Sequence, residues 1–421
     1  MAKISRRDML KISGLGIGAC LAGNALGQAA LASGNPAGHQ ALHHTFKPGT
    51  PLYADEMRIT FCGTWYTPRI KQACNSVFVE LGSESGKPMD QFVFDCGSGV
   101  VAKYVALGVP YSRMDKVFLT HLHGDHMSDL TTIYCFGPAA DRKSALNVWG
   151  PSGDTKDEGT RFFCQKLREL CKWHRESFSF LPTGYKGDGD GYDLKATELP
   201  YMKNPGLAYH NHDTGVTISH FPAIHARDGS ISYKLEWNGI SMLFTGDTKP
   251  NNYVLEHAQG VDVLIHEMAA PPDVWTTKET GLKPGDEGYA EALALNTEVI
   301  INSHTLQSAF GYIMSQTRPR LAVATHFPND PDLIKPAFAD IRCFYDGPVT
   351  IATDLLVITI NKEKKIRQAM AVVPDYPWYT ADPLKGPLAS PKYHGPLAQF
   401  NDRLLANIIP AEVYLRCTDK K

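Results

Sequence analysis

Residues 117–126 read Val-Phe-Leu-Thr-His-Leu-His-Gly-Asp-His, an apolar run that leads directly into three histidines and one aspartate. Imidazole nitrogen and carboxylate oxygen are ligands that suit Zn²⁺, with Mn²⁺ or Fe as competitors. The backbone turns sharply where a strand ends, so His121 and His123 can face one metal ion. Asp125 and His126 can then reach a second. Because crowding three imidazoles beside a carboxylate gives no packing benefit, this segment predicts a metal centre rather than a solvated surface cluster.

A centre with two metal ions needs more ligands than one hexapeptide offers. Three further candidates stand at the ends of β-type runs, in the chain order His225, Asp247 and His326. Their residue types match those of the first segment. Together the two sets supply enough imidazole and carboxylate groups for two metal ions.

The composition is typical of a folded globular protein, with 421 residues of which 43% are hydrophobic and 10% aromatic. It excludes a disordered, collagen-like or coiled-coil chain. The formal net charge is −2, whereas a protein that wraps nucleic-acid phosphates is expected to be strongly basic. Any polyanion binding must therefore be local. The length leaves the number of domains open.

Short β-type runs alternate with Gly-rich turns along the chain. Runs are predicted at 57–62, 76–81, 91–95, 116–120, 146–149, 217–221, 231–236, 241–244, 261–265, 321–325 and 349–360. Helical periodicity appears at 159–173 and 305–316. Asn238-Gly239 is a dipeptide that tight hairpins favour, and it lies between two of the runs. This interleaving predicts a layered α/β or α+β sandwich.

The first 32 residues resemble a twin-arginine export signal. Residues 5–11 read Ser-Arg-Arg-Asp-Met-Leu-Lys, and the uncharged stretch 12–32 ends in an Ala-x-Ala cleavage site. A transmembrane helix is disfavoured because glycines make the stretch weakly hydrophobic. A lipid anchor at Cys20 is disfavoured because the apolar run continues past it. We therefore expect a signal peptide over 1–32, a lead-in over 33–56, and a soluble periplasmic protein that is exported already folded.

Eight cysteines would remain after cleavage of that signal, and their spacing contains no Cys-x-x-Cys pair. A zinc-finger site is therefore excluded. Most of these cysteines lie inside apolar runs and are expected to be buried thiols. The pairing of one or two disulfides in an oxidising compartment stays open.

Several motifs resemble the metallo-β-lactamase superfamily in its ribonuclease Z-like branch. Besides 117–126 they are Phe-Cys-Gly-Thr at 61–64, Phe-Asp-Cys-Gly at 94–97, Trp-Gly-Pro at 149–151, Thr-Gly-Asp-Thr at 245–248, Ile-His-Glu at 265–267 and Ser-His-Thr at 303–305. Segments 224–226, 236–239 and 352–354 are similar to ones in a metagenome-derived metallo-β-lactamase of that branch. The resemblance implies an α+β fold, an αββα sandwich over 57–362. Residues 363–421 would form a tail that packs on this domain or at an oligomer contact.

The resemblance also assigns the seven candidate ligands to two zinc ions. One ion would be held by His121, His123 and His225. The other would be held by Asp125, His126 and His326, with Asp247 bridging both.

Two further residues take their expected roles from the same resemblance. His220 competes with His225, but the family places this ligand at a strand end, whereas His220 lies within the run 217–221 and would face the other way. Asp95 resembles a family residue that orients a zinc-bound histidine. An ordinary turn aspartate is the alternative for Asp95.

Two zinc ions lower the pKa of a shared water toward about 7, so a metal-bridging hydroxide can act as nucleophile at neutral pH. Asp125 can hold that hydroxide by a hydrogen bond as well as bind a metal ion. The leaving group needs a proton, and the resemblance implies that His304 donates it with Glu267 as acidic partner. A core histidine bonded to backbone is the alternative for His304.

These features predict an exported dinuclear zinc hydrolase of a small-molecule ester. The ester would be a phosphodiester or an aryl sulfate, the latter because the sequence is similar to metallo-β-lactamase-type arylsulfatases. The alternatives are a β-lactamase that opens the β-lactam ring and a non-catalytic metal-binding protein. We expect a small-molecule substrate and the twin-arginine export machinery as partners, and no nucleic acid. The family resemblance leaves a homo-oligomer open.

Aromatic residues between 154 and 211 are candidates for the walls of a substrate pocket. They include Trp173, Tyr185 and Tyr209. Aromatic walls suit a small organic ligand. Core or rim positions are the default expectation for each of them.

Overall fold

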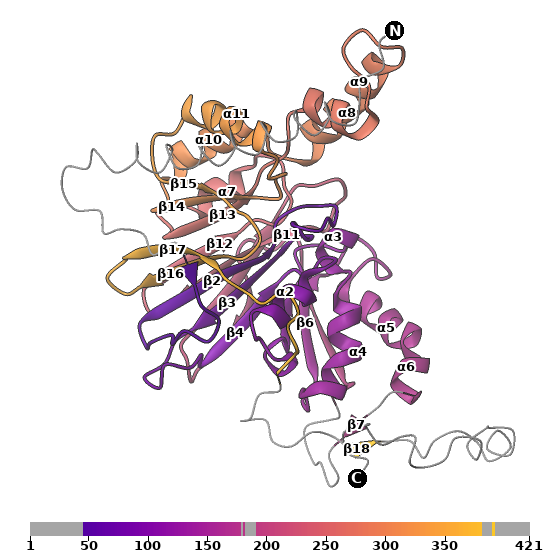
Figure 1. Cartoon of the computed structure of the whole chain (residues 1–421), viewed down its shortest axis with the longest axis vertical. Helices are drawn as coiled ribbons and strands as arrows, with labels where there is room; N and C mark the ends of the chain where they lie inside the picture. Colours follow the sequence, from indigo (N-terminus) through magenta and orange to yellow (C-terminus); the bar gives the residue numbers. More distant parts are fainter. Residues whose placement is uncertain (1–44, 178–179, 182–190, 381–389, 392–421) are drawn as a thin grey trace, which may run out of the picture. The chain divides into compact units, whose positions relative to one another are not determined.

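Two stacked β-sheets form the centre of the computed structural model (Figure 1). The structure describes residues 45–177, 180–181, 191–380 and 390–391. The predicted export signal, Cys20 and most of the predicted tail lie outside the described residues. Within these ranges no helix has the length and apolar character needed to cross a bilayer.

The first sheet has nine strands in the order β1-β17-β16-β2-β3-β4-β5-β6-β8. Their bounds are β1 Thr45–Phe46, β2 Glu56–Gly63, β3 Ser76–Leu81, β4 Asp90–Phe94, β5 Lys116–Phe118, β6 Leu146–Pro151, β8 Leu194–Leu199, β16 Leu356–Asn361 and β17 Ile366–Ala371. Strands β4, β5, β6 and β8 run parallel, whereas β16, β2, β3 and β4 pair antiparallel. The sheet extends past the predicted range 57–362 at both ends, because β1 and β17 belong to it.

The second sheet has seven strands in the order β15-β14-β13-β12-β11-β10-β9. Their bounds are β9 Gly206–His210, β10 Thr217–Pro222, β11 Ile231–Trp237, β12 Ile240–Phe244, β13 Val263–Glu267, β14 Leu321–Thr325 and β15 Val349–Ile351. Strands β12 to β15 are parallel. Strands β13 and β14 are buried along their whole length, which explains their nearly continuous apolar sequence.

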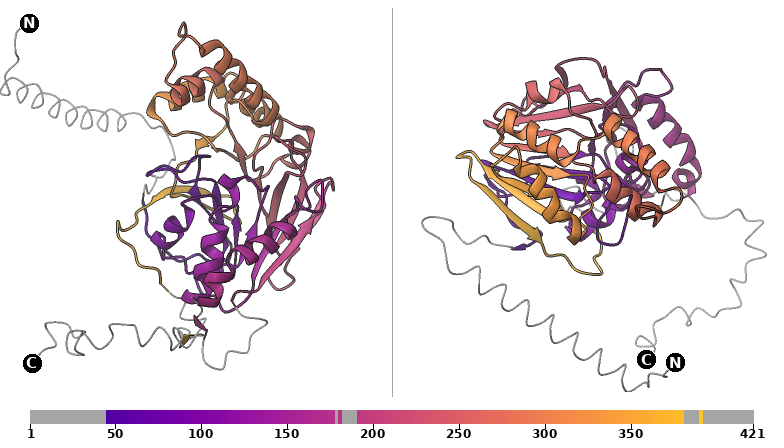
Figure 2. Two further views of the ribbon diagram at one scale, coloured as in Figure 1. Left: turned by 90° about the vertical axis from the view of Figure 1, so that its right-hand side faces the viewer. Right: turned by 90° about the horizontal axis from the view of Figure 1, so that it is seen from above.

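Helices cover the outer faces of both sheets (Figures 1 and 2). On the first sheet lie α2 Val100–Ala106, α4 Leu130–Ala140 and α5 Thr160–Leu170, and on the second α7 Asn252–His257, α10 Gln307–Thr317 and α11 Pro331–Arg342. The remaining elements are η1 Tyr111–Arg113, α3 Gly124–Met127, α6 Lys172–Ser177, α8 Pro272–Thr280, α9 Tyr289–Ser303, and the pair β7 Phe180–Leu181 and β18 Ser390–Pro391. The layers are therefore helix, sheet, sheet, helix, which confirms the predicted α+β sandwich.

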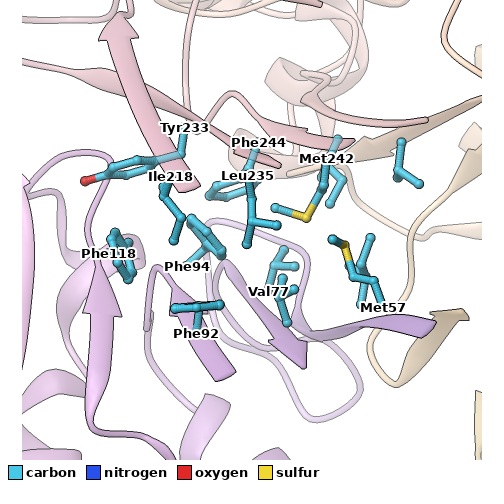
Figure 3. Packing of buried hydrophobic residues seen from close by; sticks show 14 of the residues in the cluster. Met57, Val77, Phe92, Phe94, Phe118, Ile218, Tyr233, Leu235, Met242 and Phe244 are labelled. Carbon is cyan, nitrogen blue, oxygen red and sulfur yellow. The ribbon is translucent and has the colours of Figure 1, made fainter. Parts of the chain in front are cut away.

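The core between the sheets is built from the inward-facing residues of both (Figure 3). Phe94 on β4 has its ring centroid 5.3 Å from that of Phe118 on β5 and 5.7 Å from that of Tyr233 on β11. Phe94 and Phe118 are fully buried. Removing a buried phenyl group costs roughly 3–5 kcal/mol of stability, so this layer fixes the spacing of the two sheets and of the loops at their edge.

The predicted hairpin is present between β11 and β12. Asn238 and Gly239 have φ values of 51° and 74°. Two consecutive left-handed residues are what a two-residue type I′ turn requires. The predicted helix 159–173 is interrupted at Cys171, where α5 ends and α6 follows.

The prediction of one β-type run over 349–360 is wrong. Strand β15 belongs to the second sheet and β16 to the first. Between them Leu355 adopts a φ of 70°, and Asp354 accepts hydrogen bonds from Thr64 Oγ1 at 2.8 Å and from the backbone N–H of Ala73 at 2.7 Å. This turn lets the chain cross between the sheets, although the sequence on both sides has the same β-branched character.

Candidate metal centre

The predicted ligands lie on loops at one edge of the sandwich. Strands β12, β13 and β14 are parallel, so their carboxyl ends meet at the same edge of the second sheet. Asp247 follows β12, Glu267 ends β13, and His326 follows β14. His225 follows β10, and the segment that begins with His121 follows β5 of the first sheet. Both sheets therefore contribute side chains to this edge.

The structure brings all seven predicted ligands together in two adjacent groups. Ligand atoms within each group lie within 4.8 Å of one another. The first group contains His121, His123 and His225, and the second contains Asp125, His126, Asp247 and His326.

The spacing within the first group fits a metal ion. His123 Nδ1 lies 3.0 Å from His121 Nε2 and 3.1 Å from His225 Nε2. Nitrogen atoms that bind one Zn²⁺ tetrahedrally at about 2.0–2.1 Å lie about 3.3 Å apart. The three imidazoles are therefore placed as ligands of a common ion would be.

The second group has the same spacing and shares Asp247 with the first. In this group His326 Nε2 lies 3.2 Å from Asp125 Oδ2 and 3.3 Å from Asp247 Oδ2. The other oxygen of Asp247, Oδ1, lies 3.3 Å from His126 Nε2. Asp247 Oδ2 also lies 3.8 Å from His225 Nε2. The carboxylate of Asp247 is therefore placed between the two groups.

Two buried atoms of the centre lack a partner that a cation would provide. His126 Nε2 and Asp247 Oδ1 have no hydrogen-bond partner among the described residues. A buried polar atom without a partner costs roughly 1–3 kcal/mol. Burial lowers the pKa of His225 to about 4, so its ring is neutral at pH 7 and has a free lone pair. The two orphaned atoms and the neutral ring of His225 both fit divalent metal ions.

Outer contacts fix the orientation of the ligand rings. His126 Nδ1 donates to Asp95 Oδ2 at 2.7 Å, and Asp95 Oδ1 accepts from the backbone N–H of Thr120 at 2.8 Å. His225 Nδ1 donates to the carbonyl oxygen of Ser303 at 2.8 Å. A proton on Nδ1 leaves the Nε2 lone pair free to bind a metal ion. Asp95 thus makes the contact that its expected role requires, whereas sequence reasoning missed the Ser303 carbonyl.

His304 and Glu267 form a charged pair next to both groups. The fully buried Glu267 carboxylate contacts His304 Nδ1 at 3.0 and 3.2 Å and accepts from the backbone N–H of Thr248 at 2.7 Å. Burial lowers the pKa of His304, but the carboxylates of Glu267, Asp247 and Asp125 together outweigh burial and raise it to about 9. The His304 ring centroid lies 4.9 Å from that of His225 and 5.5 Å from that of His326. A protonated imidazole is therefore held beside the ligand groups.

His220, which competed for a ligand position, lies away from these groups. Its Nε2 is 3.1 Å from the carbonyl oxygen of Pro200 on the neighbouring loop. It faces Gly206, where an added Cβ would lie 2.1 Å from the His220 ring. His220 therefore packs β10 against β9.

A cavity of about 380 Å³ opens beside the first ligand group. Besides the three histidines its lining includes Leu122, Pro151, Glu158, Phe162, Phe163 and Arg227. The cavity is within the size range of small-molecule sites.

The predicted aromatic walls of this cavity are mostly different residues. Among the described residues, Trp173 and Tyr209 do not line it, and Trp173 is 80% exposed. Tyr209 packs on Phe92 and Trp149 in the core. Tyr185 lies outside the described residues. The aromatic wall instead comes from the first turn of α5.

Known proteins share both the sequence pattern and the fold. Residues 90–327 match the beta-lactamase superfamily domain. A ribonuclease Z of Halorubrum lacusprofundi is 26% identical over 325 residues, which cover 68% of this chain and 98% of the relative. A ribonuclease BN of Proteus mirabilis is 24% identical over 243 residues, which cover 52% of this chain and 78% of the relative.

Among solved structures, the metallo-beta-lactamase fold protein YhfI from Bacillus subtilis superimposes with a TM-score of 0.50 and 19% identity. The superposition covers 72% of this chain and 100% of that protein. At this identity the likeness concerns the fold alone. The domain match covers 238 of the 421 residues (90 to 327), and with the ribonuclease relatives it shows that the chain belongs to the beta-lactamase superfamily, in its ribonuclease Z-like branch.

Proposed function

We propose that this chain is a dinuclear zinc hydrolase that cleaves phosphodiesters. The observation that carries the proposal is the shared position of Asp247 between two groups of ligand atoms with metal-ligand spacing. Two zinc ions, when bound, would supply an activated water at neutral pH and stabilise negative charge on the phosphoryl oxygens. Mn²⁺ or Fe could take the same donor set.

The residues around the ligand groups have distinct tasks in this proposal. Asp125 is 18% exposed at its side chain, so its carboxylate can accept a hydrogen bond from the attacking water as well as bind metal. His304 donates a proton to the oxygen of the leaving group. Glu267 keeps His304 protonated and fixes its ring through the contact to Nδ1. Nε2 of His304 is then the nitrogen left to serve the substrate.

The relatives favour a phosphodiester over the other esters considered. The two relatives described above are named ribonucleases, and RNA is cleaved at phosphodiester bonds. The same names argue against restricting the substrate to small molecules, so an RNA belongs among the test substrates. An aryl sulfate and a β-lactam remain the competing substrates.

A substrate panel with metal analysis tests this proposal. Purified protein is offered bis-p-nitrophenyl phosphate, p-nitrophenyl sulfate, nitrocefin and a structured RNA, with Asp247→Ala as the blank. We expect two metal ions per chain by mass spectrometry, and hydrolysis of the diester that is abolished by Asp247→Ala. Rapid nitrocefin turnover with inert phosphodiesters would make the protein a β-lactamase. Two bound metal ions without any turnover would favour a non-catalytic metal-binding protein.

We also propose that the chain is exported through the twin-arginine pathway to the periplasm. The proposal rests on Arg6-Arg7 followed by the weakly hydrophobic stretch 12–32. Replacing both arginines by lysine should retain the protein in the cytoplasm, as judged by cell fractionation. Unchanged periplasmic recovery of this double variant would contradict the proposal.

A further inference from the structure

The cavity beside the first ligand group has an apolar wall and charged residues at its rim. Phe162 and Phe163 lie in the first turn of α5 and line the cavity with Leu122 and Pro151. Phe163 and Leu122 also pack against the core under the first sheet. Phe162 is half-buried and is not part of that core. Its ring therefore belongs to the cavity wall but not to the core.

The cations at the rim are already matched by acidic partners. Arg227 forms an ion pair with Glu158. Lys166 Nζ lies 2.8 Å from Glu169 Oε2 and 5.5 Å from the centroid of the Phe162 ring. Each cation is thus offset by a neighbouring carboxylate, and the lining also contains Asp157 and Asp228, which would repel a second phosphate group. An uncharged substituent (arm) of a phosphodiester therefore fits this cavity better than a polyanionic one.

The Arg227–Glu158 pair also connects two loops that line the cavity. Arg227 lies on the loop that carries His225, and Glu158 lies on the loop before α5. The two loops meet, since a Cβ on Gly229 would lie 3.2 Å from Gly153 Cα. The pair therefore joins the two loops on either side of the cavity.

The position of His304 decides which arm of a diester the cavity can hold. Among the described residues, the lining includes His121, His123 and His225 but neither His304 nor Glu267. The leaving group must lie at His304, which donates its proton. Because His225 lines the cavity and His304 does not, the cavity is left for the arm that stays on the phosphate.

We infer that this cavity binds an aryl group on the retained arm of the phosphodiester, stacked on Phe162. The inference rests on the proposed function for the direction of cleavage. An aromatic ring directly on the ester oxygen places its apolar face against Phe162 next to the metal ligands. A nucleoside would instead place its polar sugar there.

Two diesters with the same leaving group test the inference. Phenyl p-nitrophenyl phosphate and methyl p-nitrophenyl phosphate both release p-nitrophenolate, so only the retained arm differs. We expect kcat/KM for the phenyl ester to be on the order of 10- to 100-fold higher, because burying one ring removes its apolar surface from water. Phe162→Ala should reduce this preference to within about threefold. The p-nitrophenyl ester of thymidine 5′-phosphate should react more slowly than the phenyl ester.

Phe344→Ala is the matched control. Phe344 is 50% exposed and packs against Tyr312 near the end of α11, among the described residues that do not line the cavity. This variant should keep the wild-type preference. Phe162→Leu serves as a second variant, because it retains apolar volume and removes only the ring.

Binding without cleavage separates this inference from the proposed function. Phenylphosphonate and methylphosphonate both carry a phosphonate group and no leaving group. The ratio of their dissociation constants, measured by calorimetry, therefore reports the contribution of the phenyl ring to binding. Tighter binding of phenylphosphonate that is lost in Phe162→Ala would support the aryl site even if neither diester were hydrolysed. Equal affinities, a phenyl preference that survives Phe162→Ala and Phe162→Leu, or faster cleavage of the thymidine ester would each overturn it.

Discussion

Replacing Asp95 by Asn should weaken one of the two metal sites without removing a ligand. Asp95 has a φ of 55°, a conformation that Asn tolerates well, so the backbone should persist. The amide keeps the shape of the carboxylate but loses its charge. It can also present an NH₂ group to His126 Nδ1, which is itself a donor.

The size of the effect follows from the contact that is lost. His126 Nδ1 donates to Asp95 Oδ2 at 2.7 Å, and both side chains are fully buried. A buried hydrogen bond to a charged group contributes roughly 1.5–3 kcal/mol. Since about 1.4 kcal/mol corresponds to tenfold in affinity, the ion held by His126 should bind about 10- to 100-fold more weakly. Outer partners of metal-binding histidines have effects of this size.

The assay is a chelator competition on zinc-loaded protein, with bound metal counted by mass spectrometry. Asp95→Asn should release one ion at a lower chelator concentration than the other. Asp354→Asn is the control, because Asp354 is also buried but contacts Thr64, Ala73 and Lys103 rather than a ligand of the centre. Wild-type affinity for both ions in Asp95→Asn, or equal losses in the two variants, would refute the reasoning.

Three further outcomes are expected. His304→Gln should lower kcat by about 10²- to 10⁴-fold, as loss of a general acid does, while metal content stays at the wild-type value; a parallel loss of metal would make His304 a ligand. His225→Asn should lose bound metal, whereas His220→Asn should keep it, and metal analysis of the pair would reveal a wrong assignment. Chelation should lower the Tm, and added Zn²⁺ or Mn²⁺ should restore the Tm, because ligands that bind only the folded state stabilise that state. A Tm that is unchanged by chelation would contradict a resident metal.

The clustering of the seven candidate ligands could be predicted because these residues stand at strand ends and combine residue types that bind metal ions. Three imidazoles and a carboxylate within 121–126 have no role in packing, and the sheet topology then brings His225, Asp247 and His326 to the same edge. The Ser303 carbonyl that orients His225 could not be predicted in this way. A backbone oxygen is present at every residue, so only the fold shows which one faces a ring.

The residues of the cavity wall and the crossing of the chain between the sheets could not be predicted from the sequence either. Aromatic residues occur in the core, at the rim and in pockets alike. The break between α5 and α6 places Phe162 in the cavity lining and leaves Trp173 exposed to solvent. The run 349–360 contains one turn-type residue, Asp354, but the β-branched and apolar residues on both sides of it predict a single strand. The predicted strands at 76–81 and 321–325 match the structure because both faces of these strands are buried.

A metal ion bound by side chains from both sheets would also cross-link the two sheets. Asp125 follows a strand of the first sheet and His326 a strand of the second; they are 201 positions apart along the chain, and 3.2 Å separates their ligand atoms. If Asp125 and His326 bound the same ion, they would form a cross-link that closes the long loop between them. By the relation used for covalent links, closing a loop of that length restricts the unfolded chain by about 5 kcal/mol. Metal loading would therefore hold the two sheets of the sandwich together, as a disulfide does in other proteins.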